Sequence, residues 1–370
     1  MRKITYDTSY NSDLTTGNPS SNSQKENIVD LETSKSSNAK TDKANVEKSF
    51  AVNKNQKQPV ICIGGANIDR KLYVKQAISS GTSNPVTSSK TIGGVARNIA
   101  ENLGRLGEYV TLFSVAGNDI DWKEIDAVSS PYMNLEHVTQ LEHAATGSYT
   151  AVLDQHGDMK IALADMDIFE EITPELLKGK INMLRQAKCI IIDLNCPGDT
   201  VDFLSKFTME YNIPLVVIPV SSPKMDRLPS SLDSVSWLIV NKDETETFLN
   251  TKIKNIDDWK QSVKGWLELG VKNVIVTNGA EGVILGNENG DIRYYPAIHT
   301  PEVVDVTGAG DAFCSAVIHS WLQKRTIHYI IHSGLVNSHK TITSKHTVRQ
   351  ELSAEQLKID MEEILNEKLS

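Results

Sequence analysis

The chain has 370 residues, with 38 Lys and Arg against 47 Asp and Glu, so its formal net charge is −9. Hydrophobic residues make up 39% of it, enough for a sizeable core, which excludes a wholly disordered chain. No run approaches the ~20 apolar residues of a membrane helix, and the acidic balance argues against a nucleic-acid partner. The first residues fit neither a secretory nor a mitochondrial signal, so we expect a cytoplasmic protein with no membrane or nucleic-acid partner.

Residues 1–57 differ in composition from the rest of the chain. They are mainly Ser, Asn, Lys, Asp and Thr, and show no apolar periodicity. Such a segment cannot offset its ordering entropy by burying apolar surface. We predict a disordered polar N-terminal extension over 1–57, with a tether or a partner-binding arm as the alternative, and a folded domain over 58–370.

Short apolar runs recur after Pro59, and they are typical of strands covered on both faces, as in parallel sheets. We predict strands at 60–63, 110–115, 189–193, 215–218, 235–240 and 274–277, and helices that include 98–106 and 258–269. This alternation predicts an open α/β sheet, which binds ligands beyond the carboxyl ends of its strands.

One segment breaks this alternation. Residues 149–153 and 160–164 flank a turn at 155–158, which predicts a β-hairpin. A hairpin inserted in a parallel α/β domain is expected to form a lid over the site.

The strongest chemical signal is Asp-Val-Thr-Gly-Ala-Gly-Asp-Ala-Phe at 305–313, between a strand-like stretch at 302–304 and an apolar helical run. Gly308 and Gly310 allow a sharp turn that leaves backbone N–H groups at a helix N-terminus, which is an anion site. Asp311 would then accept a hydroxyl proton beside a phosphoryl group in transfer. An ordinary Gly-rich turn is the alternative.

Two further polar stretches suit the binding of a small polyol. Gly93 and Gly94 open a helix that contains Asn98, and paired glycines let a substrate approach the main chain closely. Asn67 and Asp69 follow the first strand and point the same way in an extended chain, so they can hold vicinal hydroxyls. A Gly-rich helix start and an Asx-capped turn are the structural alternatives.

Two later strand ends carry residues suited to a nucleotide. Asn241 and Glu244 can order Mg²⁺ through water, because this ion keeps much of its hydration shell. Thr277, Gly279 and Gly282 form a turn that can hold a phosphate. Alternatively, Asn241 and Glu244 simply cap the helix that follows.

In combination, Gly93-Gly94-xxx-Asn98, Asn241-xx-Glu244 and 305–311 resemble the signatures of the PfkB/ribokinase family of carbohydrate and nucleoside kinases, over about residues 59–365. Within that family the chain most resembles pseudouridine kinases, through 65–69, 93–103 and 164–168. The resemblance implies a ribokinase-like three-layer α/β/α sandwich with a mostly parallel sheet. It also implies a small β-sheet lid, with strands near 66–92 and 146–168, through which two copies could pair as a homodimer.

The roles implied by this resemblance are assigned position by position. The catalytic base would be Asp311, and the anion hole Gly308, Ala309 and Gly310. The nucleoside would contact Asn67, Asp69, Gly93, Gly94 and Asn98, with Asp165 of the lid at the base. ATP would contact Asn241, Thr277, Gly279, Gly282 and Asn337, Mg²⁺ would bind Glu244 through water, and a monovalent cation such as K⁺ would bind Asp305.

The activity implied is ATP- and Mg²⁺-dependent phosphorylation of the 5′-hydroxyl of pseudouridine. One alternative is another kinase of the same family, of the ribokinase or adenosine kinase type. A second alternative is a catalytically silent nucleoside-binding sensor on the same fold. A dinucleotide-dependent oxidoreductase is disfavoured because the sequence lacks a GxGxxG motif.

Three departures from the family pattern are visible. Asp121-Trp122 stands where a Gly is usual, and Val306 stands where many members have Thr. The segment 336–343, which should enclose adenine, is polar and rich in His and Lys.

Overall fold

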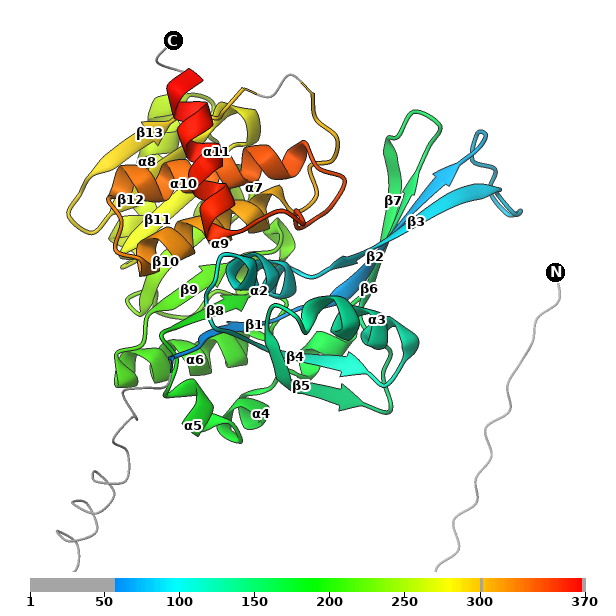
Figure 1. The fold of residues 1–370 in the computed structure, drawn as a ribbon, viewed down its shortest axis with the longest axis horizontal. Helices are drawn as coiled ribbons and strands as arrows, with labels where there is room; N and C mark the ends of the chain where they lie inside the picture. The colour runs from blue at the N-terminus through cyan, green and yellow to red at the C-terminus, as the bar shows by residue number, and fades with distance from the viewer. Residues whose placement is uncertain (1–56, 300–301, 368–370) are drawn as a thin grey trace, which may run out of the picture. The chain divides into compact units, whose positions relative to one another are not determined.

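The computed structural model describes residues 57–299 and 302–367, so the predicted extension lies outside the described residues except for Lys57. In this part of the chain a large sheet has the strand order β13-β12-β11-β10-β9-β8-β1-β4-β5 (Figure 1). Its strands are β1 (Val60–Ile63), β4 (Val110–Gly117), β5 (Asn134–Leu141), β8 (Cys189–Asp193), β9 (Leu215–Ile218), β10 (Val235–Asn241), β11 (Asn273–Thr277), β12 (Val283–Asn287) and β13 (Ile292–Tyr295).

Along the large sheet, the seven neighbouring strands β11-β10-β9-β8-β1-β4-β5 are parallel to one another. β12 and β13 extend the sheet beyond β11 as antiparallel strands. The six strands predicted from apolar runs are all confirmed. Alternate side chains of β1 enter different cores: Ile61 and Ile63 pack on one face of the sheet, whereas Val60 and Cys62 pack on the other. Both faces are therefore buried, as the continuously apolar runs predict.

Helices cover both faces of this sheet and complete the predicted three-layer sandwich. One face packs against α4 (Pro174–Lys178), α5 (Ile181–Leu184), α6 (Gly198–Tyr211), α7 (Lys242–Leu249) and α8 (Ile256–Glu268). The other packs against α2 (Val95–Arg105), α3 (Ile120–Ser129), α9 (Ala309–Leu322) and α10 (Ile327–Ile342), with α11 (Ala354–Glu367) outside α9 and α10. Among the described helices, none has the length and apolarity to cross a bilayer.

The two predicted helices begin a few residues earlier in the structure, α2 at Val95 and α8 at Ile256. Asn255 accepts hydrogen bonds from the N–H groups of Asp257 and Asp258 and so starts α8. The acidic first turn also suits the positive end of the helix dipole.

Four strands form a separate small sheet, which we call the lid sheet: β2 (Asn67–Val74), β3 (Val86–Gly93), β6 (Ser148–Leu153) and β7 (Met159–Asp165). Their order is β3-β2-β6-β7, and β6 and β7 form the predicted hairpin (Figure 1). Only Gly94 separates the end of β3 from the start of α2, so the lid sheet leads almost directly into this helix.

The strand predicted at 302–304 is wrong. The N–H groups of Val304 and Asp305 donate to the carbonyl of Ile342 at the end of α10, at 2.8 and 3.3 Å. The apolar side chains of this segment therefore follow a helix end instead of pairing with a strand.

Candidate active site

The turn before α9 needs glycine for two reasons. Gly308 has φ of +82°, which disfavours other residues. A Cβ on Gly308 would also lie 2.2 Å from the carbonyl oxygen of Thr347. The backbone of the 344–350 loop thus lies directly against this turn.

The start of α9 offers backbone donors to an anion. Ala309 N–H donates to Val306 O at 3.2 Å, so this predicted member of the anion hole already has an acceptor. Within the described residues, the N–H groups of Gly310 and Asp311 have no hydrogen-bond acceptor. These two groups, together with the helix dipole, are suited to bind an anion, and we call this position the anion site.

Asp311 faces Asn98 across the site. Asn98 Nδ2, in the first turn of α2, donates to Asp311 Oδ2 at 2.8 Å. Burial, together with the nearby charges of Asp193 and Asp69, raises the pKa of Asp311 to about 7, although the hydrogen bond from Asn98 lowers it. A carboxylate with a pKa near neutrality is well matched to accepting a proton.

The predicted polyol-binding residues lie together at the junction of lid sheet and α2. Asn67 Nδ2 donates to Asp69 Oδ1 at 2.7 Å, and Asn67 is paired with Gly93 between β2 and β3. A Cβ on Gly93 would lie 2.3 Å from Asp69 Oδ2, and one on Gly94 would lie 2.3 Å from Gly65 O. Both glycines are therefore required by close approaches within the site.

A residue to which the sequence analysis gave no role, Asp193, fixes this arrangement. It ends β8, is 1% exposed, and accepts hydrogen bonds from Gly65 N at 3.0 Å and Ala96 N at 2.9 Å. Burial raises its pKa, while these backbone bonds oppose the rise. The signal in the sequence was a carboxylate at the carboxyl end of an otherwise apolar strand.

Asn241 and Glu244 form a capping box at the start of α7, which is the alternative that the sequence left open. Glu244 N donates to Asn241 Oδ1, and Asn241 N donates to Glu244 Oε2, both at 2.8 Å. Burial raises the pKa of Glu244 to about 7. Asn241 is also paired with Thr277 at neighbouring strand ends, so the two predicted nucleotide segments are adjacent.

An apolar cavity of about 560 Å³ opens beside these strand ends. Its wall includes the predicted turn (Thr277, Gly279, Gly282) and the start of α9 (Ala309, Gly310). The remaining lining residues are Ala280, Val283, Ala297, Ile298, His299, Val303, Val306, Phe313, Leu335, Ser338, His339 and Ile342. Residues 335, 338, 339 and 342 recur at helical spacing and therefore lie on one face of α10. This face gives the cavity two apolar and two polar side chains, although the segment 336–343 as a whole is polar.

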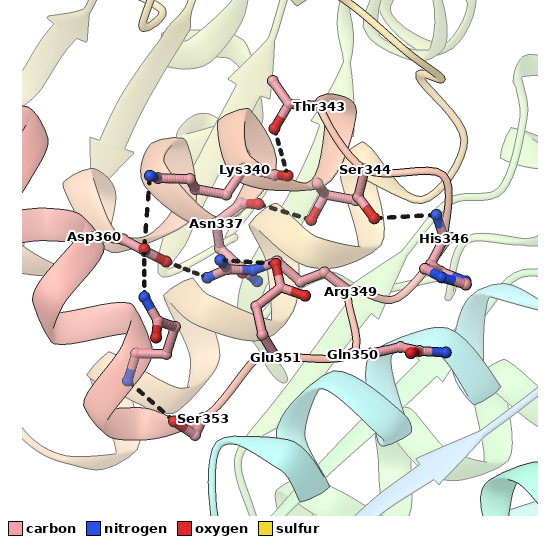
Figure 2. Close-up of polar contacts among 12 residues, drawn as sticks. Asn337, Lys340, Thr343, Ser344, His346, Arg349, Gln350, Glu351, Ser353 and Asp360 are labelled. Carbon is pink, nitrogen blue, oxygen red and sulfur yellow. Dashed lines mark hydrogen bonds and ion pairs between the residues drawn. The ribbon is translucent and has the colours of Figure 1, made fainter.

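Asn337 does not line this cavity. It is fully buried; its Nδ2 donates to Ala312 O at 2.8 Å, and its Oδ1 accepts from Arg349 Nε at 3.1 Å. Figure 2 shows Arg349 between Asn337 and Asp360. Arg349 forms an ion pair with Asp360, with 2.6 Å between Nη2 and Oδ2. The structure thus gives Asn337 a packing role that links α9, α10 and α11.

Asp305 and Asp165, the remaining predicted site residues, lie in different surroundings. The carboxylate of Asp305 accepts from Lys71 Nζ at 2.6 Å and from Thr307 N at 3.0 Å. Asp165 is exposed at the end of β7, opposite Ser148 of β6. Lys71 had no role in the sequence analysis.

Asp121, one of the departures, also contacts the lid sheet. It accepts hydrogen bonds from Arg70 of β2 at 2.5 Å and from Lys90 of β3 at 2.9 Å. The replacement of the usual glycine therefore adds an ionic contact between α3 and the lid sheet.

Known proteins resemble this chain over most of its length. The sequence pattern of the pfkB family carbohydrate kinases matches residues 57–354. The pseudouridine kinase of Escherichia coli (strain K12) is 30% identical over 270 residues, which span 72% of this chain and 85% of the relative. A guanosine-inosine kinase of Exiguobacterium acetylicum is 25% identical over 253 residues, which span 68% of this chain and 84% of the relative.

The fold is shared with solved kinases as well. The ribokinase of Arabidopsis thaliana, solved with ribose and ATP, superposes with a TM-score of 0.74 at 18% identity and covers 83% of this chain and 99% of the ribokinase. The likeness to this ribokinase shows the fold. The family match over residues 57–354 and the 30% identity to the Escherichia coli relative show that the chain belongs to the pfkB family of carbohydrate kinases, phosphotransferases that act on hydroxyl groups.

Proposed function

We propose that this chain transfers the γ-phosphoryl group of Mg-ATP to the 5′-hydroxyl of pseudouridine. The observation that carries the transfer step is the contact between Asp311 and Asn98 beside the free N–H groups at the start of α9. The acceptor is supported by the likeness to the pseudouridine kinase of Escherichia coli, at 30% identity.

The chemistry follows from what each group can do. Asn67 and Asp69 hold the ribose hydroxyls, and Asp311 accepts the proton of the 5′-hydroxyl as its oxygen attacks the γ-phosphorus. The bond between the γ-phosphorus and the bridging oxygen of ADP breaks, and the N–H groups of Gly310 and Asp311 stabilise the charge on the transferring group. Positioning and electrostatics supply most of the rate enhancement in such transfers.

The apolar cavity would hold the nucleobase of ATP. Its volume of about 560 Å³ lies within the range of pockets that take drug-sized ligands, and its wall meets the anion site at Gly310. The Arabidopsis ribokinase solved with ATP has the same fold, which supports ATP as the donor.

Mg²⁺ would be held through water and the phosphates. Among the described residues, no group of three or more His, Cys, Asp or Glu could hold a metal by itself. One oxygen of Glu244 accepts from Asn241 N, and the other could order a metal-bound water. This fits Mg²⁺, which usually keeps several waters and binds one or two carboxylates; the ion would neutralise charge on the phosphates.

The test is an acceptor panel with the full chain. ADP release from ATP would be measured with pseudouridine, uridine, adenosine, guanosine, inosine and ribose, and the product identified by phosphorus NMR. We expect pseudouridine to give the highest kcat/KM and a 5′-monophosphate. Preference for guanosine and inosine would instead indicate the activity named for the Exiguobacterium relative. If no acceptor increases ADP release, the alternative of a catalytically silent nucleoside-binding sensor would be supported.

Asp165 is proposed to contact the base of the nucleoside. It lies exposed at the end of β7, where the lid sheet could bring it over the acceptor. Asp165→Ala should reduce discrimination between pseudouridine and uridine while leaving the KM for ATP unchanged. Unchanged discrimination would contradict this assignment.

A second copy of the chain is the proposed partner of the lid sheet. Met159, Ile161 and Leu163 alternate along the edge strand β7 and are 58%, 50% and 54% exposed. Three apolar side chains on one face of an exposed strand favour burial against another surface. Light scattering should give the mass of a dimer, and Leu163→Asp should give that of a monomer; an unchanged mass would contradict this interface.

A further inference from the structure

Lys71 connects the lid sheet to the loop that precedes the anion site. It lies two residues after Asp69 on β2, so Asn67, Asp69 and Lys71 share one face of the strand. Its ammonium donates to Asp305 Oδ2 at 2.6 Å and to Thr307 Oγ1 at 3.2 Å. A cation carried by the lid sheet therefore lies directly beside the start of the anion-hole loop.

This ammonium lies where the family resemblance implies a monovalent cation, so the fit of such an ion can be tested on Asp305. Oδ2 accepts from Lys71, while Oδ1 accepts from Thr307 N at 3.0 Å and Thr307 Oγ1 at 2.7 Å. Three donors occupy most of the roughly four lone-pair positions of the carboxylate. Its negative charge is already paired with the Lys71 ammonium, which would repel K⁺. The residues as arranged do not fit an additional K⁺.

The electrostatics of this loop are already satisfied by the chain itself. Burial opposes ionisation of Asp305, yet the hydrogen bonds from Lys71 and Thr307 hold its pKa below the usual value. The side chains of Lys71 and Asp305 are 27% and 35% exposed, so the pair adds little to global stability. Its effect is expected on the geometry of the loop that leads to Gly308.

We propose that Lys71 is a lid-borne replacement for the monovalent cation, and that its ammonium orders the 305–308 loop when the lid sheet lies against it. The inference rests on the proposed kinase function for its rate readout. A diffusible cation would bind whether the lid sheet is near or not, whereas Lys71 couples loop order to the position of the lid sheet. Lys71 is thus a positioning residue that acts through Asp305.

The experiment compares the full-length protein with Lys71→Ala, in KCl and in tetramethylammonium chloride at equal ionic strength. We expect the wild-type rate to change by less than about twofold between the two salts. Lys71→Ala should lose about tenfold or more in kcat without added K⁺, as expected when a charge near the transferring group is removed. K⁺ should restore much of this loss, because the vacated position can then accept the ion, whereas Li⁺ should not.

Lys75→Ala is the matched control, since Lys75 is an exposed lysine just beyond the end of the same strand. A second readout needs no turnover: K⁺ should raise the Tm of Lys71→Ala in the presence of ADP more than it raises that of the wild type. This measurement remains valid if pseudouridine proves to be the wrong acceptor. Wild-type activation by K⁺, a Lys71→Ala rate equal to that of Lys75→Ala, or no K⁺-specific effect on Lys71→Ala would each overturn the proposal.

Discussion

The two halves of the site are built in different ways. The half that we propose binds the acceptor, called the acceptor half, consists of Asn67, Asp69, Asn98 and Asp311, whose side chains are joined by hydrogen bonds of 2.7 and 2.8 Å. The half that we propose binds ATP, called the nucleotide half, is an apolar cavity whose wall comes from β11, β12, α9, α10 and the segments between them. The first depends on individual polar atoms, and the second depends on shape and apolar area.

This difference sets the size of the effects to be expected. Removing a charged or hydrogen-bonding group from a water-poor site changes transition-state stabilisation directly. Trimming one side chain of an apolar wall removes only the area that side chain covers. Single substitutions should therefore be severe in the acceptor half and graded in the nucleotide half.

Asp311→Asn should have the largest effect. The amide cannot accept the hydroxyl proton, so kcat should fall by ~10² or more, while the KM values should change little. Asp257→Asn, at an exposed aspartate of α8, is the control for a change of the same kind far from the site. If Asp311→Asn kept the wild-type kcat, Asp311 would not be the catalytic base.

Gly308→Ala tests the close approach in the anion-hole turn. A Cβ would meet Thr347 O at 2.2 Å, so the turn must move and kcat should fall by about tenfold or more. Gly157→Ala is the matched control, because Gly157 also has positive φ, +86°, but no atom lies within 4 Å of its Cβ position. Equal losses in both variants would mean that backbone strain alone, and not the contact with Thr347, is responsible.

The pH dependence should report the burial of Asp311. Because its pKa is raised to about 7, kcat/KM should fall about tenfold per pH unit below that value. The buried Glu244, whose pKa is also raised to about 7, can steepen the fall. A rate that stays flat down to about pH 5 would show that the essential base has an ordinary carboxylate pKa.

The same pKa shift gives a stability prediction with a definite sign. The folded chain holds the proton of Asp311 up to about pH 7, whereas the unfolded chain loses it near 3.8. The stability contributed by this group therefore falls as pH rises through that window. Asp311→Asn removes the buried negative charge that Asp311 carries at about pH 8, so it should raise the Tm there although it lowers activity. A lower Tm at this pH would show that burial of the charged carboxylate does not destabilise the folded chain.

The proximity of the residues in the acceptor half could be predicted from sequence, because they lie in short stretches at strand ends and helix starts; their roles stay predictions. Asn67, Asp69, Gly93, Gly94, Asn98 and Asp311 are brought together as expected of an open α/β sheet. Asp193 was missed because its role comes from backbone groups of two distant segments. Lys71 was missed because its contact with Asp305 spans 234 residues.

The nucleotide half was less predictable for a physical reason. An apolar wall residue has the same composition and periodicity as a core residue, so Leu335 and Ile342 carry no distinguishing mark in the sequence. Asn337 shows a limit of the family resemblance, which implies a contact with ATP. In the structure its amide is buried and is hydrogen-bonded to Ala312 and Arg349.

Ile342→Ser should give a graded effect on the nucleotide half. It removes apolar area from the cavity wall, so the KM for ATP and the Kd for ADP should rise by about tenfold, with kcat nearly unchanged. Ile359→Ser, at an exposed residue of α11, is the control. Isothermal titration with ADP measures the change directly, and an unaltered Kd would place the nucleobase outside this cavity.

Asp121→Gly should have the smallest effect, although it breaks two ionic contacts with the lid sheet. Arg70 and Lys90 are each 34% exposed, and ion pairs at such positions contribute at most about 1 kcal/mol. We expect the KM for the nucleoside to rise by less than about fivefold, and the rise to shrink further in high salt because exposed charges are screened. Asp121 and Asp311 are the same residue type, yet Asp121 is ion-paired with two partly exposed cations, whereas Asp311 accepts a hydrogen bond from the buried, uncharged Asn98. An Asp121→Gly loss as large as that of Asp311→Asn would mean that closure of the lid sheet, and not proton acceptance, limits the reaction.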